Sequence, residues 1–469
     1  MIVSENQAKL QFTLQKVAIA WGFCLVVTSV NRVAIADLGL PAMLVSFIIG
    51  VYTLFGPLQP VIGRICERYP IFGYRRTPYL LLGTLLGGMA FPFMPGVMVE
   101  MQSGSPLATL KLMFLFCCFG LCIAMQANTF LDLLKDTTSE EARSRITTLT
   151  WTIQALAMAF WAWVFALLMR DYSLQEMQAL YNLSPLIMVG ITFLGAYRLE
   201  TPLTREQVAA IKDNPPPPVS VMEPMRESMG VLSYNRHARL FFIFIIFSLM
   251  SVFLQDLLQE IWAKDLFSMN AGDATVFQRL YNGFNTVGMG IMGIYVGISA
   301  KKRRAKLKEG EDPGPTLPFA KGKKLLLLGV SLSCLSFLLL AWASFEQNLT
   351  MFYAFYVVSA TALGLYVFPS VSFMADMTVR HQESRYLGVW SLAQIIGLFL
   401  SFTVAGTIYT ALVESGLLSS NTGFAVIFGL QALVVVLSYI AVKSVTVEGL
   451  NAGARDIDNL RDTANAQTT

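Results

Sequence analysis

The chain has 469 residues, of which 55% are hydrophobic and only 14% are charged, and its mean hydropathy is +0.57. A soluble domain carries about 25% charged residues, so this composition excludes an ordinary soluble protein and indicates many membrane-spanning helices. The net charge of +4 is too small to indicate nucleic-acid binding. The six cysteines lack the spacing of metal ligands, which favours packing over redox chemistry.

Apolar runs of about 20 residues predict membrane-spanning helices. Charged or Gly/Pro-rich breaks divide the chain into twelve such runs, at residues 12–30, 43–63, 78–97, 109–134, 146–168, 183–198, 239–261, 275–298, 323–344, 350–375, 386–412 and 422–442. With both termini cytoplasmic, 28 of the 34 Lys and Arg residues fall in cytoplasmic segments and five in external ones. The positive-inside rule therefore predicts that orientation.

A short charged loop separates the second and third predicted spans. It reads GRICERYPIFGYRRTPY over residues 63–79, and its four arginines and one glutamate cannot cross a bilayer core cheaply. Its Gly63, Glu67-Arg68, Gly73 and Arg75-Arg76 resemble the loop between helices 2 and 3 of major facilitator transporters. We therefore predict an all-α polytopic membrane protein with a major facilitator fold, in which 12 transmembrane helices form two six-helix halves and both termini are cytoplasmic.

A repeated spacing follows the fourth and tenth predicted spans. An aspartate, an arginine and a glutamine lie nine residues apart in two places, at Asp136, Arg145 and Gln154 and at Asp376, Arg385 and Gln394. The equivalent locations indicate a duplicated half, as expected of a fold whose halves rock about a central site. A carboxylate at a helix end beside an arginine can form an ion pair that holds the cytoplasmic side shut; the alternative is simple capping of helix ends. The predicted gating and ion-pair residues are Glu67, Arg68, Arg75, Arg76, Asp136, Arg145, Asp376 and Arg385.

Two long cytoplasmic loops follow the sixth and the eighth predicted spans, and the first of them divides the chain into halves of six spans. Residues 215–218 are four prolines, which form a stiff spacer. We predict an N-terminal six-helix half at 1–199, a cytoplasmic Pro-rich linker at 200–236, a C-terminal six-helix half at 237–445 and a cytoplasmic tail at 446–469. The basic loop at 299–322 is typical of an anchor for anionic lipid headgroups, and the alternative is a docking site for a partner.

Polar residues deep in predicted spans are functional candidates because the hydrocarbon penalises them. We expect the polar ends of the first and seventh spans to meet across the halves near the external side, with Arg32 facing Asp256 or Glu260. The alternative is independent interfacial charges that extend to water. The residues of this predicted inter-half cluster are Asn31, Arg32, Gln255, Asp256 and Glu260. The chain has only two histidines and neither a phosphate-binding loop nor a Ser/His/Asp arrangement, so we predict no enzymatic activity, no catalytic residues and no metal site.

Three separated segments carry a more specific resemblance. Asn31-Arg32 followed by LGLPA at 38–42 resembles a signature of the PucC/LhaA family, also called the bacteriochlorophyll delivery (BCD) family, within the major facilitator superfamily. YPIFGYRRTPY at 69–79 is similar to that family's lengthened 2–3 loop, and GVWSLAQ at 388–394 to its span-11 signature. The resemblance covers about residues 12–445.

The resemblance implies a membrane assembly factor for light-harvesting or photosystem complexes in a phototroph. Such a factor binds or delivers (bacterio)chlorophyll, or a precursor, to pigment-binding polypeptides. The implied partners are membrane lipid, light-harvesting or photosystem polypeptides and chlorophyll synthase. The implied location is a multi-pass protein of the cytoplasmic, intracytoplasmic or thylakoid membrane. Because histidine is scarce in the spans, the candidates for holding the pigment magnesium are Asn128, Asp132, Gln154 and Gln394.

Two alternatives remain open. One is a secondary transporter that moves a small amphipathic solute by alternating access. The other is a non-transporting scaffold that docks antenna proteins through helix faces and the basic loop at 299–322.

Overall fold

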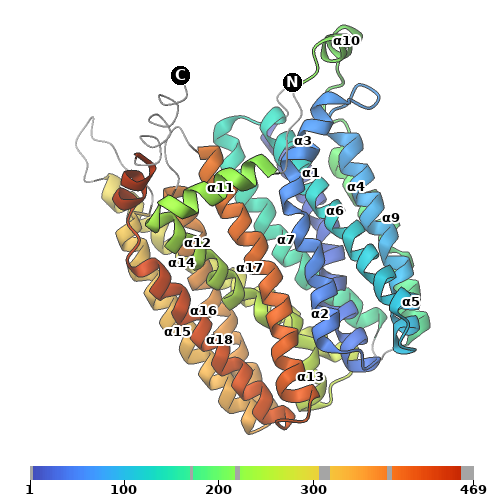
Figure 1. Cartoon of the computed structure of the whole chain (residues 1–469), viewed down its shortest axis with the longest axis vertical. Coiled ribbons are helices and arrows are strands. Elements are labelled where there is room, and N and C mark those ends of the chain that lie inside the picture. The colour runs from blue at the N-terminus through green and yellow to red at the C-terminus, as the bar shows by residue number, and fades with distance from the viewer. Residues whose placement is uncertain (1–3, 170–172, 217–221, 306–316, 378–382, 456–469) are drawn as a thin grey trace. The chain divides into compact units, whose positions relative to one another are not determined.

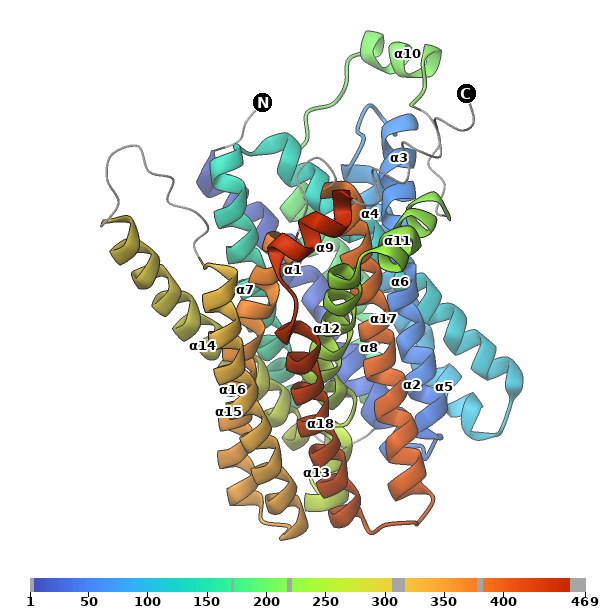
Figure 2. The ribbon, with the colours of Figure 1, turned by 60° about the vertical axis from the view of Figure 1, so that its left-hand side comes forward.

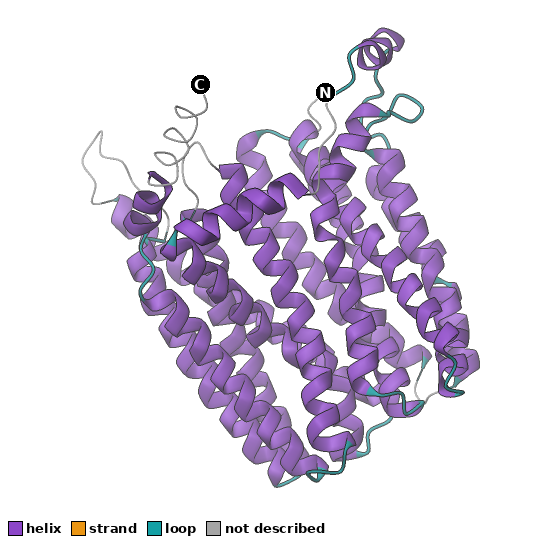
Figure 3. Ribbon diagram, viewed as in Figure 1, coloured by secondary structure: helices purple, strands orange, loops and turns teal. Residues whose placement is uncertain are grey.

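The structure is a computed structural model and describes residues 4–169, 173–216, 222–305, 317–377 and 383–455. In these ranges it is helical throughout, apart from loops and one isolated bridge between Ile71 and Tyr74 (Figure 3). Twelve helical stretches in the described ranges are long and apolar enough to cross a membrane. The prediction of an all-α protein with twelve spans is confirmed.

The helices pack into two compact units. Unit 1 consists of Met1–Val221, Asp256–Asn282 and Phe402–Thr410, and unit 2 of Met222–Gln255, Gly283–Ser401 and Ala411–Thr469. Two short segments from the second half of the sequence therefore belong to the unit that is built mainly from the first half. Contacts between these segments and the N-terminal spans are contacts inside unit 1.

The helices of unit 1 are coloured blue to green in Figure 1, except α13 (Gln259–Phe267), which is yellow-green. They are α1 (Glu5–Cys24), η1 (Leu25–Val30), η2 (Val33–Asp37), α2 (Ala42–Gly50), η3 (Val51–Leu58), α3 (Gln59–Arg68), α4 (Thr77–Ala90), η4 (Phe91–Phe93), α5 (Met94–Gln102), α6 (Pro106–Thr137), α7 (Glu140–Leu168), α8 (Leu174–Asn182), α9 (Ser184–Ala196), α10 (Arg205–Asp213) and α13 (Gln259–Phe267). The first span, Glu5–Asp37, is the most deeply buried of the twelve, because 94% of its most apolar window is covered by other residues.

Small residues let α1 approach its neighbours closely. A Cβ at Gly195 on α9 would lie 2.7 Å from the main-chain oxygen of Gln11, and a Cβ at Gly22 would lie 2.9 Å from the ring of Phe119 on α6. Such contacts replace the hydrophobic effect as the source of helix association in a membrane. Beside them, Ala8 and Phe12 of α1 pack with Phe130 of α6 in a buried cluster. This packing fixes α1 against α6, α7 and α9.

Unit 2 is assembled in the same way. Its helices are α11 (Met222–Tyr234), α12 (Arg236–Phe253), most of α14 (Ala271–Arg304), α15 (Phe319–Phe345), α16 (Leu349–Asp376), most of α17 (Glu383–Tyr409) and α18 (Ser420–Lys443), together with parts of η5 (Leu254–Leu257) and η6 (Thr410–Glu414). Helices α15, α16 and α18 run side by side (Figures 1 and 2). Gly288 of α14 and Gly364 of α16 approach so closely that a Cβ on either would collide with the other helix.

The region predicted to be a linker contains two short helices around its prolines. Helix α10 has no buried residue and begins with a capping box, in which the Thr204 hydroxyl accepts from Gln207 N–H and the Gln207 side chain accepts from Thr204 N–H. Helix α11 follows the prolines. In the predicted tail, residues 447–455 are helical, and the Leu450 carbonyl accepts a 2.9 Å hydrogen bond from Asn235 at the start of α12.

Candidate functional site

The loop between α3 and α4 is held in a tight turn. Phe72 and Gly73 have positive φ angles of 52° and 81°, and Ile71 and Tyr74 exchange two 2.9 Å main-chain hydrogen bonds across them. A Cβ at Gly73 would lie 3.3 Å from the carbonyl oxygen of Leu203, which donates its own N–H to the Gly73 carbonyl at 2.8 Å. Glycine, which has no Cβ, suits both the positive φ angle and the close approach of Leu203. The turn is therefore fixed against the segment that follows α9.

Glu200, from that same segment, caps the first turn of α4. Its carboxylate accepts hydrogen bonds from the N–H groups of Arg75 at 2.7 Å, Arg76 at 3.0 Å and Thr77 at 2.7 Å. The first N–H groups of a helix have no partner within the helix, and the helix dipole favours a negative charge at that end. Sequence reasoning missed Glu200, because its partners are main-chain groups more than 120 residues away.

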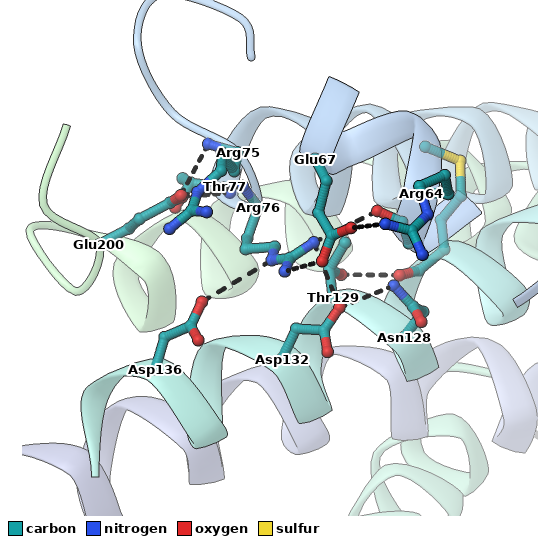
Figure 4. A network of polar contacts seen from close by, with 12 residues as sticks. Arg64, Glu67, Arg75, Arg76, Thr77, Asn128, Thr129, Asp132, Asp136 and Glu200 are labelled. Atoms are coloured by element: carbon teal, nitrogen blue, oxygen red, sulfur yellow. Dashed lines mark hydrogen bonds and ion pairs between the residues drawn. The ribbon is translucent and has the colours of Figure 1, made fainter. Parts of the chain in front are cut away.

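The capped turn presents Arg76 to three carboxylates (Figure 4). Its Nη2 lies 3.4 Å from Glu67 on α3, its Nη1 3.3 Å from Asp132 on α6, and its Nε 3.8 Å from Asp136, one turn further along α6. Arg76 is only 5% exposed. A buried guanidinium is stable only when carboxylates and hydrogen-bond acceptors surround it, and this one joins the ends of α3, α4 and α6.

A close approach of α3 and α6 brings these groups within reach. A Cβ at Gly63 would lie 2.9 Å from the side-chain nitrogen of Asn128, and that nitrogen donates to Asp132 at 3.1 Å. On the other side, Arg64 contacts Glu67 at 3.0 Å. We call Arg64, Glu67, Arg76, Asn128, Asp132, Asp136 and Glu200 the loop network.

The loop network contains some of the predicted gating residues. Glu67 and Asp136 meet at Arg76, as drawn in Figure 4. Arg68 instead lies over the ring of Tyr69, 5.6 Å from its centroid, and Arg75 contributes its main-chain N–H. Three predicted side chains, those of Arg145, Asp376 and Arg385, fall outside the described ones. Gating by these residues stays a prediction.

A second polar cluster lies where the first span ends. Arg32, only 3% exposed, donates from Nη1 to the carbonyl of Glu260 at 3.3 Å and from Nη2 to that of Met269 at 2.9 Å, and its Nε lies 3.5 Å from Asp37. Lys264 approaches the other oxygen of Asp37 at 3.1 Å. Arg32 thus contacts Glu260, one of its two predicted partners, through the main-chain carbonyl. The carboxylate that pairs with Arg32 is that of Asp37, which sequence reasoning missed.

The other members of the predicted inter-half cluster are also buried. Asn31 donates to the carbonyl of Leu257, and Gln259 donates to Asp256 at 3.0 Å. Both carboxylate oxygens of Glu260 and both polar atoms of the Gln255 side chain are buried without a hydrogen bond to any described residue. We call Asn31, Arg32, Asp37, Asp256, Gln259, Glu260 and Lys264 the span-end cluster.

The four candidates for pigment magnesium have different surroundings. Asn128 and Asp132 belong to the loop network, where Asp132 contacts Arg76. Gln394 on α17 donates to the sulfur of Met374 at 3.4 Å. Gln154 on α7 is 9% exposed, and its buried Oε1 accepts no hydrogen bond from a described residue. Among the described residues, no group of three or more His, Cys, Asp and Glu is arranged to hold a metal ion.

Comparison with known proteins gives one match to a family model. The model described as PUCC protein matches residues 29–309 and 317–450. The matched ranges include every residue of the loop network and all of the span-end cluster.

Two relatives and one solved structure extend this result. The chain is 25% identical to the "Bacteriochlorophyll synthase 44.5 kDa chain" of Rhodobacter capsulatus, over 91% of this chain and 93% of that one. It is 21% identical to "Protein PucC" of Cereibacter sphaeroides, over 85% and 82%. The crystal structure of the nucleoside transporter NupG superposes with a TM-score of 0.66 at 11% identity, over 94% of this chain and 99% of that one. This last likeness shows the fold, which is that of the major facilitator superfamily.

Proposed function

Because this chain belongs to the PUCC protein family, we propose that it is a membrane assembly factor for light-harvesting or photosystem complexes. In this role it binds (bacterio)chlorophyll, or a precursor, and delivers it to pigment-binding polypeptides. The observation that carries the proposal is the family match, which spans most of both halves of the chain. The names of two relatives, a bacteriochlorophyll synthase chain and PucC, support the link to pigment.

The chemistry of the chain is compatible with a chlorin ligand. A chlorin is large, flat and mostly apolar, and the chain offers 33 Phe, 16 Tyr and 22 Met to surround it. Magnesium takes oxygen ligands, which makes the buried, unsatisfied Oε1 of Gln154 the best placed of the four candidates. The proposed role is not enzymatic: the protein holds and transfers pigment, and the carbon chemistry belongs to other proteins.

The proposed membrane location and the proposed partners follow from this role. The twelve-span fold places the chain in contact with membrane lipid, and we assign it to the cytoplasmic, intracytoplasmic or thylakoid membrane of a phototroph. Its proposed protein partners are light-harvesting or photosystem polypeptides and chlorophyll synthase.

A secondary transporter is the second candidate function. Two observations favour it: the fold is shared with a nucleoside transporter, and the loop network ties three helix ends together as a gate would. In this alternative the protein moves a small amphipathic solute by alternating access. A scaffold for antenna proteins, without transport, is the third.

Purification in mild detergent from a phototrophic host separates these functions. Absorbance in the red region that co-elutes with the protein in roughly stoichiometric amount supports the pigment role. Solute-dependent uptake into proteoliposomes without bound pigment would favour the transporter. Co-purified antenna helices with neither pigment nor uptake would favour the scaffold.

A further inference from the structure

Lys16 is a basic residue inside the first span, Glu5–Asp37. Of the 34 Lys and Arg residues, 28 lie in predicted cytoplasmic segments and five in external ones, which leaves Lys16 within the first span. A cation in the hydrocarbon region is costly and by default marks a functional site. A lysine within a span usually extends its ammonium toward water. The surroundings of the ammonium therefore distinguish a binding residue from one that reaches the membrane surface.

The ammonium of Lys16 lies between two aromatic rings. Its Nζ is 4.5 Å from the ring centroid of Phe130 on α6 and 4.2 Å from that of Trp151 on α7. Both distances are within the range of a cation–π interaction. Among the described residues, no ion pair joins this ammonium to a carboxylate. Lys16 is therefore held against aromatic faces with its positive charge unneutralised.

Trp151 differs from Trp390, the tryptophan that lies between the arginine and the glutamine of the repeat in the other half. Trp390 is 1% exposed, packs edge-on against Phe241 at 4.8 Å and donates its indole N–H to the Met377 carbonyl at 3.0 Å. Trp151 is 57% exposed. Trp390 is thus a packing residue of unit 2, whereas Trp151 presents a broad open indole surface beside a cation.

A buried acceptor lies one helical turn away from Trp151. Gln154 follows it by three residues on α7, so the two side chains share a face of the helix. The Gln154 side chain is 9% exposed, and its Oε1 is buried without a hydrogen bond from a described residue. An unsatisfied buried oxygen is unfavourable unless a ligand or water completes it. The ammonium of Lys16, the exposed indole of Trp151 and the Gln154 oxygen therefore come from two helices, α1 and α7, that pack against each other.

We propose that Lys16, Trp151 and Gln154 form a binding site for a flat, mostly apolar ligand that carries a carboxylate. This inference rests on the proposed function and sharpens it: the pigment handled is a chlorin with a free propionate, not its ester. The Lys16 ammonium would pair with the carboxylate in a charge-assisted hydrogen bond. The macrocycle would stack on the exposed indole of Trp151, and Gln154 would offer its oxygen to a polar group of the ring or its magnesium.

A matched pair of ligands tests the proposal. Chlorophyllide a and its propionate methyl ester share one macrocycle, but the propionate is a charged carboxylate in the first and an uncharged ester in the second. Binding of both to the full-length protein in phosphatidylcholine nanodiscs can be measured by tryptophan quenching. We expect the wild type to bind the free acid roughly tenfold more tightly, the ratio that one charge-assisted contact supplies. Lys16→Gln should remove this preference, Lys16→Arg should keep most of it, and Trp151→Ala should weaken binding of both ligands.

Two further variants guard against indirect effects. Lys16→Met places an apolar side chain in the span, so it tests loss of charge without a membrane penalty. Lys9→Gln removes a lysine from the same helix, where it pairs with Glu5 at 2.8 Å, and should leave the preference unchanged. Adding phosphatidylglycerol to the nanodiscs tests the headgroup of an anionic lipid as the ligand: competition only in chains with Lys16 would assign the cation to lipid and overturn the pigment site.

The outcomes separate the site from the general function. Equal binding of the two chlorins by the wild type, or a preference that survives both Lys16→Gln and Lys16→Met, overturns the site and leaves the pigment role intact. Failure of the wild type to bind either chlorin overturns the proposed function together with the site.

Discussion

Adjacent arginines in the α3–α4 loop have different roles because their side chains have different surroundings. Arg76 is buried and contacts Glu67, Asp132 and Asp136, while the described contact of Arg75 is the hydrogen bond of its main-chain N–H to Glu200. A buried guanidinium that loses its partners, or carboxylates that lose their guanidinium, are left unsatisfied. We therefore expect the side chain of Arg76 to contribute more to the free energy of unfolding than that of Arg75.

Replacing Arg76 should destabilise the protein far more than replacing its neighbour. Arg76→Gln leaves three carboxylates without their shared cation, and we expect a loss of about 1–3 kcal/mol, the cost of unsatisfied polar groups. Arg76→Lys keeps the charge but not the planar fork of donors, so its effect should be intermediate. Thermal unfolding in detergent measures both, with Arg75→Gln as the control. Equal shifts for Arg75→Gln and Arg76→Gln would contradict the contacts described here.

Gly63 should tolerate no side chain, because α3 lies against Asn128 there. Gly63→Ala would place its Cβ 2.9 Å from the Asn128 amide, and we expect destabilisation of about 1–3 kcal/mol, as for other overpacked sites. Asn128→Ala in the same chain should recover part of it. Gly96→Ala is the control, since no atom outside its own helix lies within 4 Å of a Cβ there. Comparable melting temperatures for the Gly63 and Gly96 variants would argue against the close approach.

At the scale of elements, the start of α4 determines where the loop network lies, and the end of the first span determines where the span-end cluster lies. Helix α4 starts under the Glu200 carboxylate, so its first turn presents Arg76 toward α3 and α6. The first span changes to wider turns after Cys24, as shown by hydrogen bonds from Asn31 N–H to the Val26 carbonyl and from Leu38 N–H to that of Val33. Such wide turns are frequent at functional sites. Here they precede and follow Asn31 and Arg32.

The Glu200 cap should contribute to stability through its charge. Glu200→Gln keeps one acceptor oxygen but loses the negative charge at the start of α4, and Glu200→Ala loses the cap altogether. We expect losses of about 0.5–2 kcal/mol for Ala, in the range of other helix caps, and a smaller loss for Gln. Hydrogen exchange at the amides of Arg75, Arg76 and Thr77 reports the cap directly and should accelerate in both variants. Unchanged protection there would show that Glu200 does not hold the turn, and Glu206→Gln on the exposed α10 serves as the reference.

At the scale of the whole molecule, hydropathy predicted the fold because twelve apolar stretches must each cross a membrane and satisfy their own backbone groups. The repeat and loop residues also pointed to Glu67, Arg76 and Asp136. Asp37 and Glu200 were missed because their partners are far away in sequence and are partly main-chain groups. Lys16 was detectable in principle as a cation inside the first predicted span, but the aromatic rings around it come from α6 and α7 and required the structure.

Unit 1 contains segments from both sides of the proline run, which leads to a prediction about a chain cleaved there. Segment Asp256–Asn282 lies after the proline run in sequence but belongs to unit 1, where it accepts hydrogen bonds from Asn31 and Arg32 and provides Lys264 to Asp37. A protease site inserted at the proline run would therefore yield two fragments that remain associated after cleavage, because each carries part of the same buried cluster. Affinity capture through an N-terminal tag in mild detergent, followed by electrophoresis, measures the retained C-terminal fragment.

Substitutions in the span-end cluster should weaken that association. Asn31→Ala with Arg32→Ala removes the side-chain donors to the carbonyls of Leu257, Glu260 and Met269, so the captured fraction of the C-terminal fragment should fall several-fold, as expected for a loss of about 1–3 kcal/mol. Lys111→Ala, which breaks an exposed pair with Glu100 elsewhere in unit 1, should leave the fraction unchanged. Complete separation of the cleaved wild-type fragments would show that the cluster does not hold them together, and equal retention by the double variant would assign the association to apolar contacts.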